Sequence, residues 1–155
     1  MELTWVQPTR ELLVELFEDS PDYFQRLHGG PYQDKDVTDV FEQMPPGVNE
    51  KQAWLAMEGE VPVGLVDFLI GYPEPGTAYI GFLLVRESRH GEGLGARLCA
   101  FVEETAGCDK IVLAVLETNE PAFAFWGKMG FRATGEMRPY EGHSVAMMQK
   151  VRGYR

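Results

Sequence analysis

Three glycines at alternate positions form the feature of this sequence with the clearest chemical meaning. They lie in "HGEGLG", residues 90–95, directly before an apolar helical pattern. Glycine has no β-carbon, so a chain rich in it lets the backbone approach a ligand closely. The start of a helix adds unpaired N–H groups and the positive end of the helix dipole, which favour an anion. The spacing therefore predicts a turn that binds phosphate.

Two known phosphate-binding motifs, the P-loop and the dinucleotide fingerprint, do not fit this turn fully. A P-loop needs Gly-Lys-Ser/Thr, and "GLGARL" contains no such lysine, which excludes nucleoside triphosphate hydrolysis. A dinucleotide fingerprint matches the spacing of Gly91, Gly93 and Ala96, with Glu117 as the acid that binds ribose. That fingerprint normally opens a doubly wound parallel sheet, whereas here it follows antiparallel strands. A dinucleotide-dependent oxidoreductase is therefore the weaker alternative. A glycine turn that only starts a helix, without binding a ligand, is a further alternative.

Hydrophobic periodicity predicts an α/β fold with a mixed sheet around this turn. A short strand over residues 3–7 precedes three helices within residues 8–47, the second opened by Ser20 as N-cap. Three strands joined by short turns must be antiparallel neighbours, and a helix followed by an apolar strand adds one parallel βαβ unit. The expected strands are 53–58, 61–73, 77–85, 110–116, 131–140 and 143–151, with helices over 93–107 and 120–130.

Length and charge limit the classes of function. The 155 residues suit one domain, and the net charge of −10 argues against nucleic acid while suiting a cationic amine. The N-terminus does not read as a signal peptide and no apolar run is long enough for a membrane span, which favours a cytoplasmic protein that does not bind membranes. The two cysteines and three histidines show no metal-ligand spacing, so no metal is expected.

A second motif, "NEPAFAFWGKMGF" over residues 119–131, decides between the interpretations of the glycine turn. It has the order N-x-x-A-x-x-F-[aromatic]-x-x-x-G-F. Together with the glycine turn it resembles the GNAT superfamily of acyl-CoA-dependent N-acyltransferases, over about residues 53–151. The resemblance implies a GNAT-like fold with a central, mostly antiparallel sheet of six to seven strands and flanking helices. It also implies one domain over residues 1–155, in which residues 1–50 vary with the substrate and 53–151 hold the cofactor.

The resemblance implies that backbone N–H groups of the turn bind the pyrophosphate of coenzyme A. The pantetheine arm then enters between strands 77–85 and 110–116, where a main-chain N–H stabilises the oxyanion. His90 replaces the family's usual Gln or Arg, and Arg89 is an additional donor to phosphate. The implied cofactor-binding residues are Leu83, Leu84, Val85, His90, Gly91, Glu92, Gly93, Leu94, Gly95, Ala96, Asn119, Ala122, Phe125 and Trp126.

The catalytic residues are less clearly marked. Many family members have a tyrosine acid where this chain has Trp126, and an indole does not ionise usefully. A protonated amine must lose a proton before it attacks, so a base is needed. Tyr79 is nearest to the family's usual glutamate, and Glu117 and Asp67 are the carboxylates expected near the cleft. We favour Glu117 over Asp67 at this point.

The sequence thus predicts an N-acetyltransferase. It would transfer acetyl from acetyl-CoA to a primary amine of a small molecule or a protein, directly within a ternary complex. The acceptor is expected between strand 77–85 and the aromatic side chains Tyr23, Phe24 and Tyr32. A non-catalytic acyl-CoA-binding module is the alternative from another class, and the resemblance also allows a homodimer through the final strand.

Overall fold

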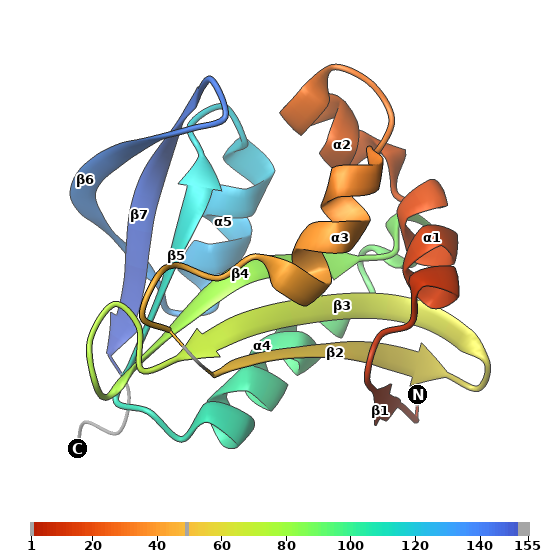
Figure 1. Ribbon diagram of the computed structural model, residues 1–155, viewed down its shortest axis with the longest axis horizontal. Helices are drawn as coiled ribbons and strands as arrows, with labels where there is room; N and C mark the ends of the chain where they lie inside the picture. The colour runs from red at the N-terminus through yellow and green to blue at the C-terminus, as the bar shows by residue number, and fades with distance from the viewer. Residues whose placement is uncertain (1, 49, 152–155) are drawn as a thin grey trace.

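A seven-stranded mixed sheet forms the centre of the computed structural model, which describes residues 2–48 and 50–151 (Figure 1). The strand order is β1-β2-β3-β4-β5-β7-β6, and β4 with β5 is the one parallel pair of this sheet. The predicted mixed α/β fold with one parallel unit is confirmed. The strands are β1 Thr4–Val6, β2 Lys51–Glu58, β3 Val61–Ile70, β4 Thr77–Val85, β5 Lys110–Leu116, β6 Arg132–Tyr140 and β7 His143–Val151.

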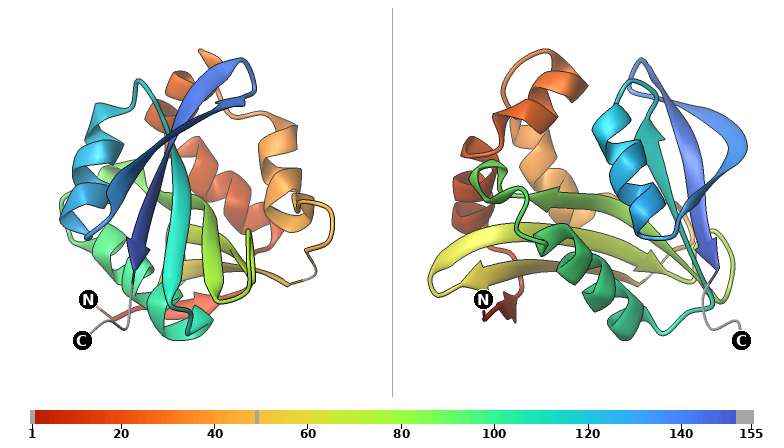
Figure 2. Two further views of the ribbon diagram at one scale, coloured as in Figure 1. Left: turned by 90° about the vertical axis from the view of Figure 1, so that its left-hand side faces the viewer. Right: turned by 180° about the vertical axis from the view of Figure 1, so that it is seen from behind.

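Helices cover both faces of the sheet. Helices α1 (Arg10–Glu18), α2 (Pro21–His28) and α3 (Asp34–Glu42) lie on the face turned to the viewer in Figure 1. Helices α4 (Leu94–Ala106) and α5 (Glu120–Lys128) lie on the opposite face, as the right-hand view of Figure 2 shows. Each face has its own buried hydrophobic cluster. The described part of the chain contains no helix that is both long and apolar enough to cross a bilayer.

Local sequence signals explain most helix ends. The Thr9 side chain accepts a hydrogen bond from the Leu12 N–H and caps α1. Gly29, with φ 74°, ends α2 in the left-handed conformation. Ser20 is the N-cap residue of α2, as predicted, but its side chain makes no capping hydrogen bond. Its buried hydroxyl donates instead to the Leu16 carbonyl oxygen at 2.8 Å, at the end of α1.

The two parallel strands pair over only part of their length. The pairing of β4 with β5 ends at Ile80 opposite Leu113, yet β4 continues to Val85 and β5 to Leu116. A register shift between Asp67 and Phe68 bends the neighbouring pair of β3 and β4 at the same level. The strands therefore part beyond Ile80 and leave a gap in the middle of the sheet.

Candidate active site

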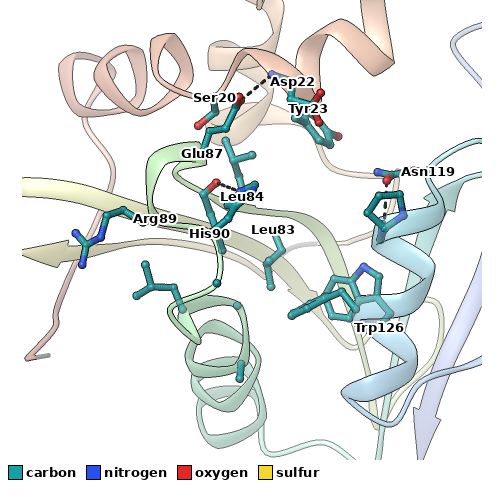
Figure 3. A pocket seen from close by; sticks show the side chains of 18 of the residues that line it. Ser20, Asp22, Tyr23, Leu83, Leu84, Glu87, Arg89, His90, Asn119 and Trp126 are labelled. Atoms are coloured by element: carbon teal, nitrogen blue, oxygen red, sulfur yellow. Dashed lines mark hydrogen bonds between the residues drawn. The ribbon is translucent and has the colours of Figure 1, made fainter.

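A cavity of about 610 Å³ opens where β4 and β5 part (Figure 3). Its walls come from the end of β4, the glycine turn, the start of α4, one side of α5, and Asp22, Tyr23 and Arg26 of α2. It includes most of the residues expected to bind the cofactor. These are Leu83, Leu84, Val85, His90, Gly91, Gly93, Leu94, Gly95, Ala96, Asn119, Ala122, Phe125 and Trp126.

The glycine turn presents the uncapped start of α4 to this cavity. Gly91 and Gly93 have φ of 85° and 80°, and a β-carbon on either would meet open space. No side chain caps the helix, so the first-turn N–H groups are left for a ligand or water. Glu92 is the one residue of the predicted turn that does not line the cavity, since its carboxylate accepts from the Arg89 Nε at 2.7 Å.

Gly95 is required for a different reason than the other two glycines. A β-carbon there would lie 2.6 Å from the Phe125 ring atom Cε1, which is shorter than van der Waals contact. The missing side chain therefore lets α4 and α5 approach each other on one wall of the cavity. Helix packing is thus a second reason for glycine at position 95, which also lines the cavity, and the role of its N–H toward phosphate stays a prediction.

The polar side chains around the turn already have partners in the protein. The His90 ring Nε2 lies 3.0 Å from the Val85 carbonyl oxygen. The Arg89 guanidinium donates to Glu58 at 2.8 Å as well as to Glu92. Asn119 accepts from the Ala122 N–H at 3.2 Å, so it caps α5 while also lining the cavity. The first-turn N–H groups of α4, which no side chain caps, therefore stay the predicted donors to an anion at this site.

Trp126 packs into the wall beneath the cavity. It is buried, and its ring lies 5.0 Å from Phe125 and 5.0 Å from Phe131, edge to face in both cases. Figure 3 shows the indole on α5 facing the end of β4. This side chain has an apolar packing role against the gap, and it is not a proton donor to a thiolate.

A second cavity of about 430 Å³ lies further back along β4, over the same sheet. Its floor is the sheet face that carries Asp67, Tyr79 and Gly81, and it continues onto β5 and β7. The roof is formed by Leu27 of α2, the segment 43–45 after α3, Tyr72, and the tip of the β6–β7 hairpin. Both cavities border the gap, the first on Leu83 and the second on Gly81, Ala114 and Leu116.

A buried carboxylate stands where the second cavity meets the gap. Asp67 is 7% exposed, and a β-carbon on Gly81 would lie 2.6 Å from its Oδ1. Gly81 is the first residue of β4 beyond the pairing with β5, so the carboxylate reaches the gap across a position without a side chain. Burial raises the pKa of Asp67 to about 7, and the Lys51 ammonium, 3.7 Å from Oδ2, acts in the opposite direction.

A family comparison gives this geometry a context. The model of the acetyltransferase (GNAT) family matches residues 11–131, which is most of the chain. The chain belongs to this family. An acetyltransferase of Agrobacterium fabrum is 30% identical over 84 residues, which cover 53% of this chain and 61% of that protein. The chain thus matches about three fifths of the length of that curated relative.

Solved structures of other acetyltransferases share the fold over nearly the whole chain. An acetyltransferase from Thermus thermophilus has a TM-score of 0.77 at 28% identity, with 97% of each chain covered. The PaiA N-acetyltransferase from Thermoplasma acidophilum, solved in complex with coenzyme A, has a TM-score of 0.67 at 15% identity, covering 97% of this chain and 99% of that one. At 15% identity, the likeness to the PaiA structure shows a shared fold only. The predicted resemblance to GNAT proteins is confirmed.

The three candidate bases of this GNAT protein occupy different surroundings. Asp67 and Tyr79 both line the second cavity, and burial raises the pKa of the Tyr79 phenol, which makes it a poorer base. Glu117 is exposed and lines neither cavity, although its backbone N–H pairs with Ser144. The structure therefore brings two of the three candidates together and leaves Glu117 outside.

The aromatic side chains expected around the acceptor lie in different surroundings, some in the core and one at the first cavity. Phe24 is buried and packs 5.0 Å from the Phe17 ring and 6.1 Å from Tyr32. Tyr23 stacks on Phe82 at 5.1 Å and lines the first cavity. None of these expected residues lines the second cavity. Phe24 lies in the hydrophobic core, because this face of α2 packs against other buried apolar side chains.

Several residues of the second cavity carry no signal in the sequence. Arg138 on β6, Tyr72 in the connection between β3 and β4, and Lys51 on β2 enter the site only through the fold. Gly81 is the exception, because a glycine inside a strand indicates a bulge or a close approach.

Lys51 connects Asp67 to the end of α3. Its Nζ donates to the Asp39 carbonyl at 2.9 Å and the Gln43 carbonyl at 2.8 Å, and its side chain is 10% exposed. Replacing Lys51 with Met removes the charge that lowers the pKa of Asp67, so this pKa rises. We expect the acid limb of the pH–rate profile to move upward by about one pH unit.

The shift caused by Lys51→Met is measured as kcat/KM against pH. Lys51→Arg keeps the charge and should leave the limb in place. Lys110→Met, which removes a surface ion pair with Glu74 at 3.0 Å, is the matched control for loss of a lysine. An unmoved limb in Lys51→Met contradicts the prediction.

Proposed function

We propose that this chain is an acetyl-CoA-dependent N-acetyltransferase that acts on a primary amine. The observation that carries the proposal is the pair of cavities that border one gap in the sheet, with Asp67 lining the second of them. One cavity has an uncapped helix N-terminus suited to a diphosphate, and the other holds a buried carboxylate suited to an amine. A binding module for acyl-CoA needs only the first of these cavities.

The main chain of β4 supplies the donors for the pantetheine arm and the oxyanion. The Arg86 N–H donates to Val63 on β3, so the alternate residues Val85 and Leu83 turn their N–H and C=O groups to the open side. The Val85 carbonyl already accepts from His90 on that side. An N–H group on this open side of β4, where a bound substrate excludes water, stabilises negative charge on the thioester oxygen.

The reaction then follows as direct transfer. The acceptor ammonium gives one proton to the Asp67 carboxylate, and the freed amine attacks the thioester carbonyl carbon. A C–N bond forms and the C–S bond breaks. The nitrogen still carries one proton more than the amide needs, and it passes this second proton to water or to the coenzyme A thiolate once that has departed. The amide and coenzyme A then leave. A thiol has a pKa of about 8.5, so its thiolate departs without an obligatory acid, which is consistent with Trp126 at the family's tyrosine position.

Gly93→Val tests the coenzyme site. Valine at φ 80° is strained by about 1–3 kcal/mol, and relief of this strain turns the first N–H groups of α4 away from the cavity. We expect the Kd for coenzyme A, measured by calorimetry, to rise about tenfold or more. Gly59→Val carries a similar strain at φ 62° in the β2–β3 turn and should leave the Kd unchanged. Equal affinities in the parent protein and Gly93→Val would remove the basis for the coenzyme site.

Thiol release tests the activity itself. The purified protein is given acetyl-CoA and a panel of amino acids, arylalkylamines, polyamines and peptides, and free coenzyme A is measured against time. Amine-dependent release supports the proposal. Tight coenzyme A binding with no release on any amine favours the binding module, and binding of NAD(H) or NADP(H) in place of coenzyme A favours the oxidoreductase.

A further inference from the structure

The second cavity is not acidic, although the chain as a whole is. The net charge is −10, which on its own favours a polycationic acceptor. Among the described residues that line the cavity, the acids and bases besides the tyrosines are Lys51, Asp67 and Arg138. One carboxylate therefore faces two cations. A polyamine would place several positive charges beside them, which like-charge repulsion opposes.

Arg138 brings positive charge to the hairpin side of this cavity. It projects from β6, and its Nε donates to the Glu136 carboxylate at 2.8 Å on the same strand. Its electrostatic neighbours include the phenols of Tyr79 and Tyr72. An arginine guanidinium has five N–H donors, and the Nε contact uses one of them. The planar terminal groups suit a carboxylate, which they bind in a bidentate way.

Tyr79 lines the same cavity as Arg138 and Asp67. The Arg138 guanidinium lowers the pKa of the Tyr79 phenol and the Asp67 carboxylate raises it, beside the larger rise caused by burial. The Tyr79 ring lies 5.6 Å from that of Tyr72 at an angle of 73°. The remaining wall is mainly aliphatic or thioether in character. This wall consists of Leu27, Met44, Pro45, Leu69, Ile80, Ala114, Leu116, Pro139, Val145 and Met147.

From this arrangement we propose that the acceptor is a small aromatic or apolar monoamine that also carries a carboxylate. The amine lies at Asp67, the apolar body lies over Tyr79, and the carboxylate pairs with Arg138. The volume of about 430 Å³ suits a molecule of this size. The inference rests on the proposed function, since it names the substrate class of the same site. It replaces the polycationic acceptor that the overall charge suggests.

Matched pairs of amines test the role of the carboxylate. Phenylalanine is compared with phenethylamine, and 4-(aminomethyl)benzoate with benzylamine, while spermidine represents polyamines. We expect the carboxylated member of at least one pair to have a kcat/KM about 10- to 100-fold higher, the size typical of a hydrogen bond between charged groups. Spermidine is expected to be the poorest acceptor.

Arg138→Gln should abolish that preference, chiefly by raising the KM of the carboxylated member of the pair. Arg132→Gln is the matched control, because Arg132 is exposed on the same strand and does not line the cavity. The inference is overturned if neither pair shows a preference, if spermidine is the best acceptor, or if Arg138→Gln keeps the preference. In those cases amine acetylation itself still stands, whereas absence of turnover on every amine overturns the proposed function and this inference together.

Discussion

Asp67→Asn is expected to lower kcat by about 100- to 1,000-fold and to leave the Kd for coenzyme A unchanged. A positioned general base contributes rate factors of this order, and asparagine keeps the shape of the side chain but cannot accept the proton. The Asp67 carboxylate is the buried acid that reaches the gap across Gly81. Steady-state thiol release gives kcat, and calorimetry gives the Kd for coenzyme A.

Glu117→Gln is the control that separates the two carboxylates. Glu117 is exposed and lines neither cavity, so its replacement should change kcat less than about twofold. The reverse outcome, a large loss in Glu117→Gln with an active Asp67→Asn protein, would identify Glu117 at the end of β5 as the base.

The parent protein should gain activity as the pH rises through about 7, the pKa of Asp67, because the base must be ionised.

The raised pKa of Asp67 is tested by a stability measurement on the parent protein and Asp67→Asn. The folded protein holds the pKa of Asp67 near 7, above the ordinary value of 3.8, so the folded state binds its proton more tightly than the unfolded state. The associated stability is full below pH 3.8 and is lost as the pH rises towards 7. The difference in unfolding free energy, variant minus parent, should therefore increase by up to about 1.4 kcal/mol per pH unit across that window. A constant difference would show that the carboxyl group titrates normally.

Much of the fold follows from local signals in the sequence. The short turns after β2 and β3 allow only antiparallel neighbours, and the apolar β5 after a helix requires the parallel crossover. The glycine turn and the "NEPAFAFWGKMGF" motif indicate the coenzyme side, because each describes a backbone shape or a helix stripe that neighbouring residues determine. Such features need no knowledge of distant contacts.

The acceptor side depends on contacts between distant segments. Asp67 is singled out by the shift in register beside it, by burial under the hairpin, and by Lys51, which also holds the end of α3. None of these is visible in the local pattern, where Asp67 and Glu117 both look like acids on strands. A carboxylate becomes a base through its surroundings, and those surroundings come from segments far apart in the chain.

Gly95→Ala is expected to destabilise the fold by about 1–3 kcal/mol, the usual cost of overpacking a buried contact. The added β-carbon would lie 2.6 Å from the Phe125 ring, so the ring or the two helices must shift, and the coenzyme cavity that both residues line changes shape. Denaturant unfolding gives the free energy, and the Kd for coenzyme A should rise in parallel. Gly91→Ala is the control, since φ of 85° adds strain but its β-carbon meets open space.

The reason for the Gly95 effect is tested in a double-mutant cycle with Phe125→Ala. Removing the ring creates a void and is destabilising in the parent protein, whereas in Gly95→Ala it removes the obstacle. The two substitutions should therefore be less destabilising together than the sum of their separate effects, by about 1 kcal/mol or more. Gly91→Ala with Phe125→Ala should be additive, because that β-carbon does not meet the ring. Additivity in both pairs would mean that Gly95 is needed for its backbone alone, and that the wall between α4 and α5 tolerates a side chain.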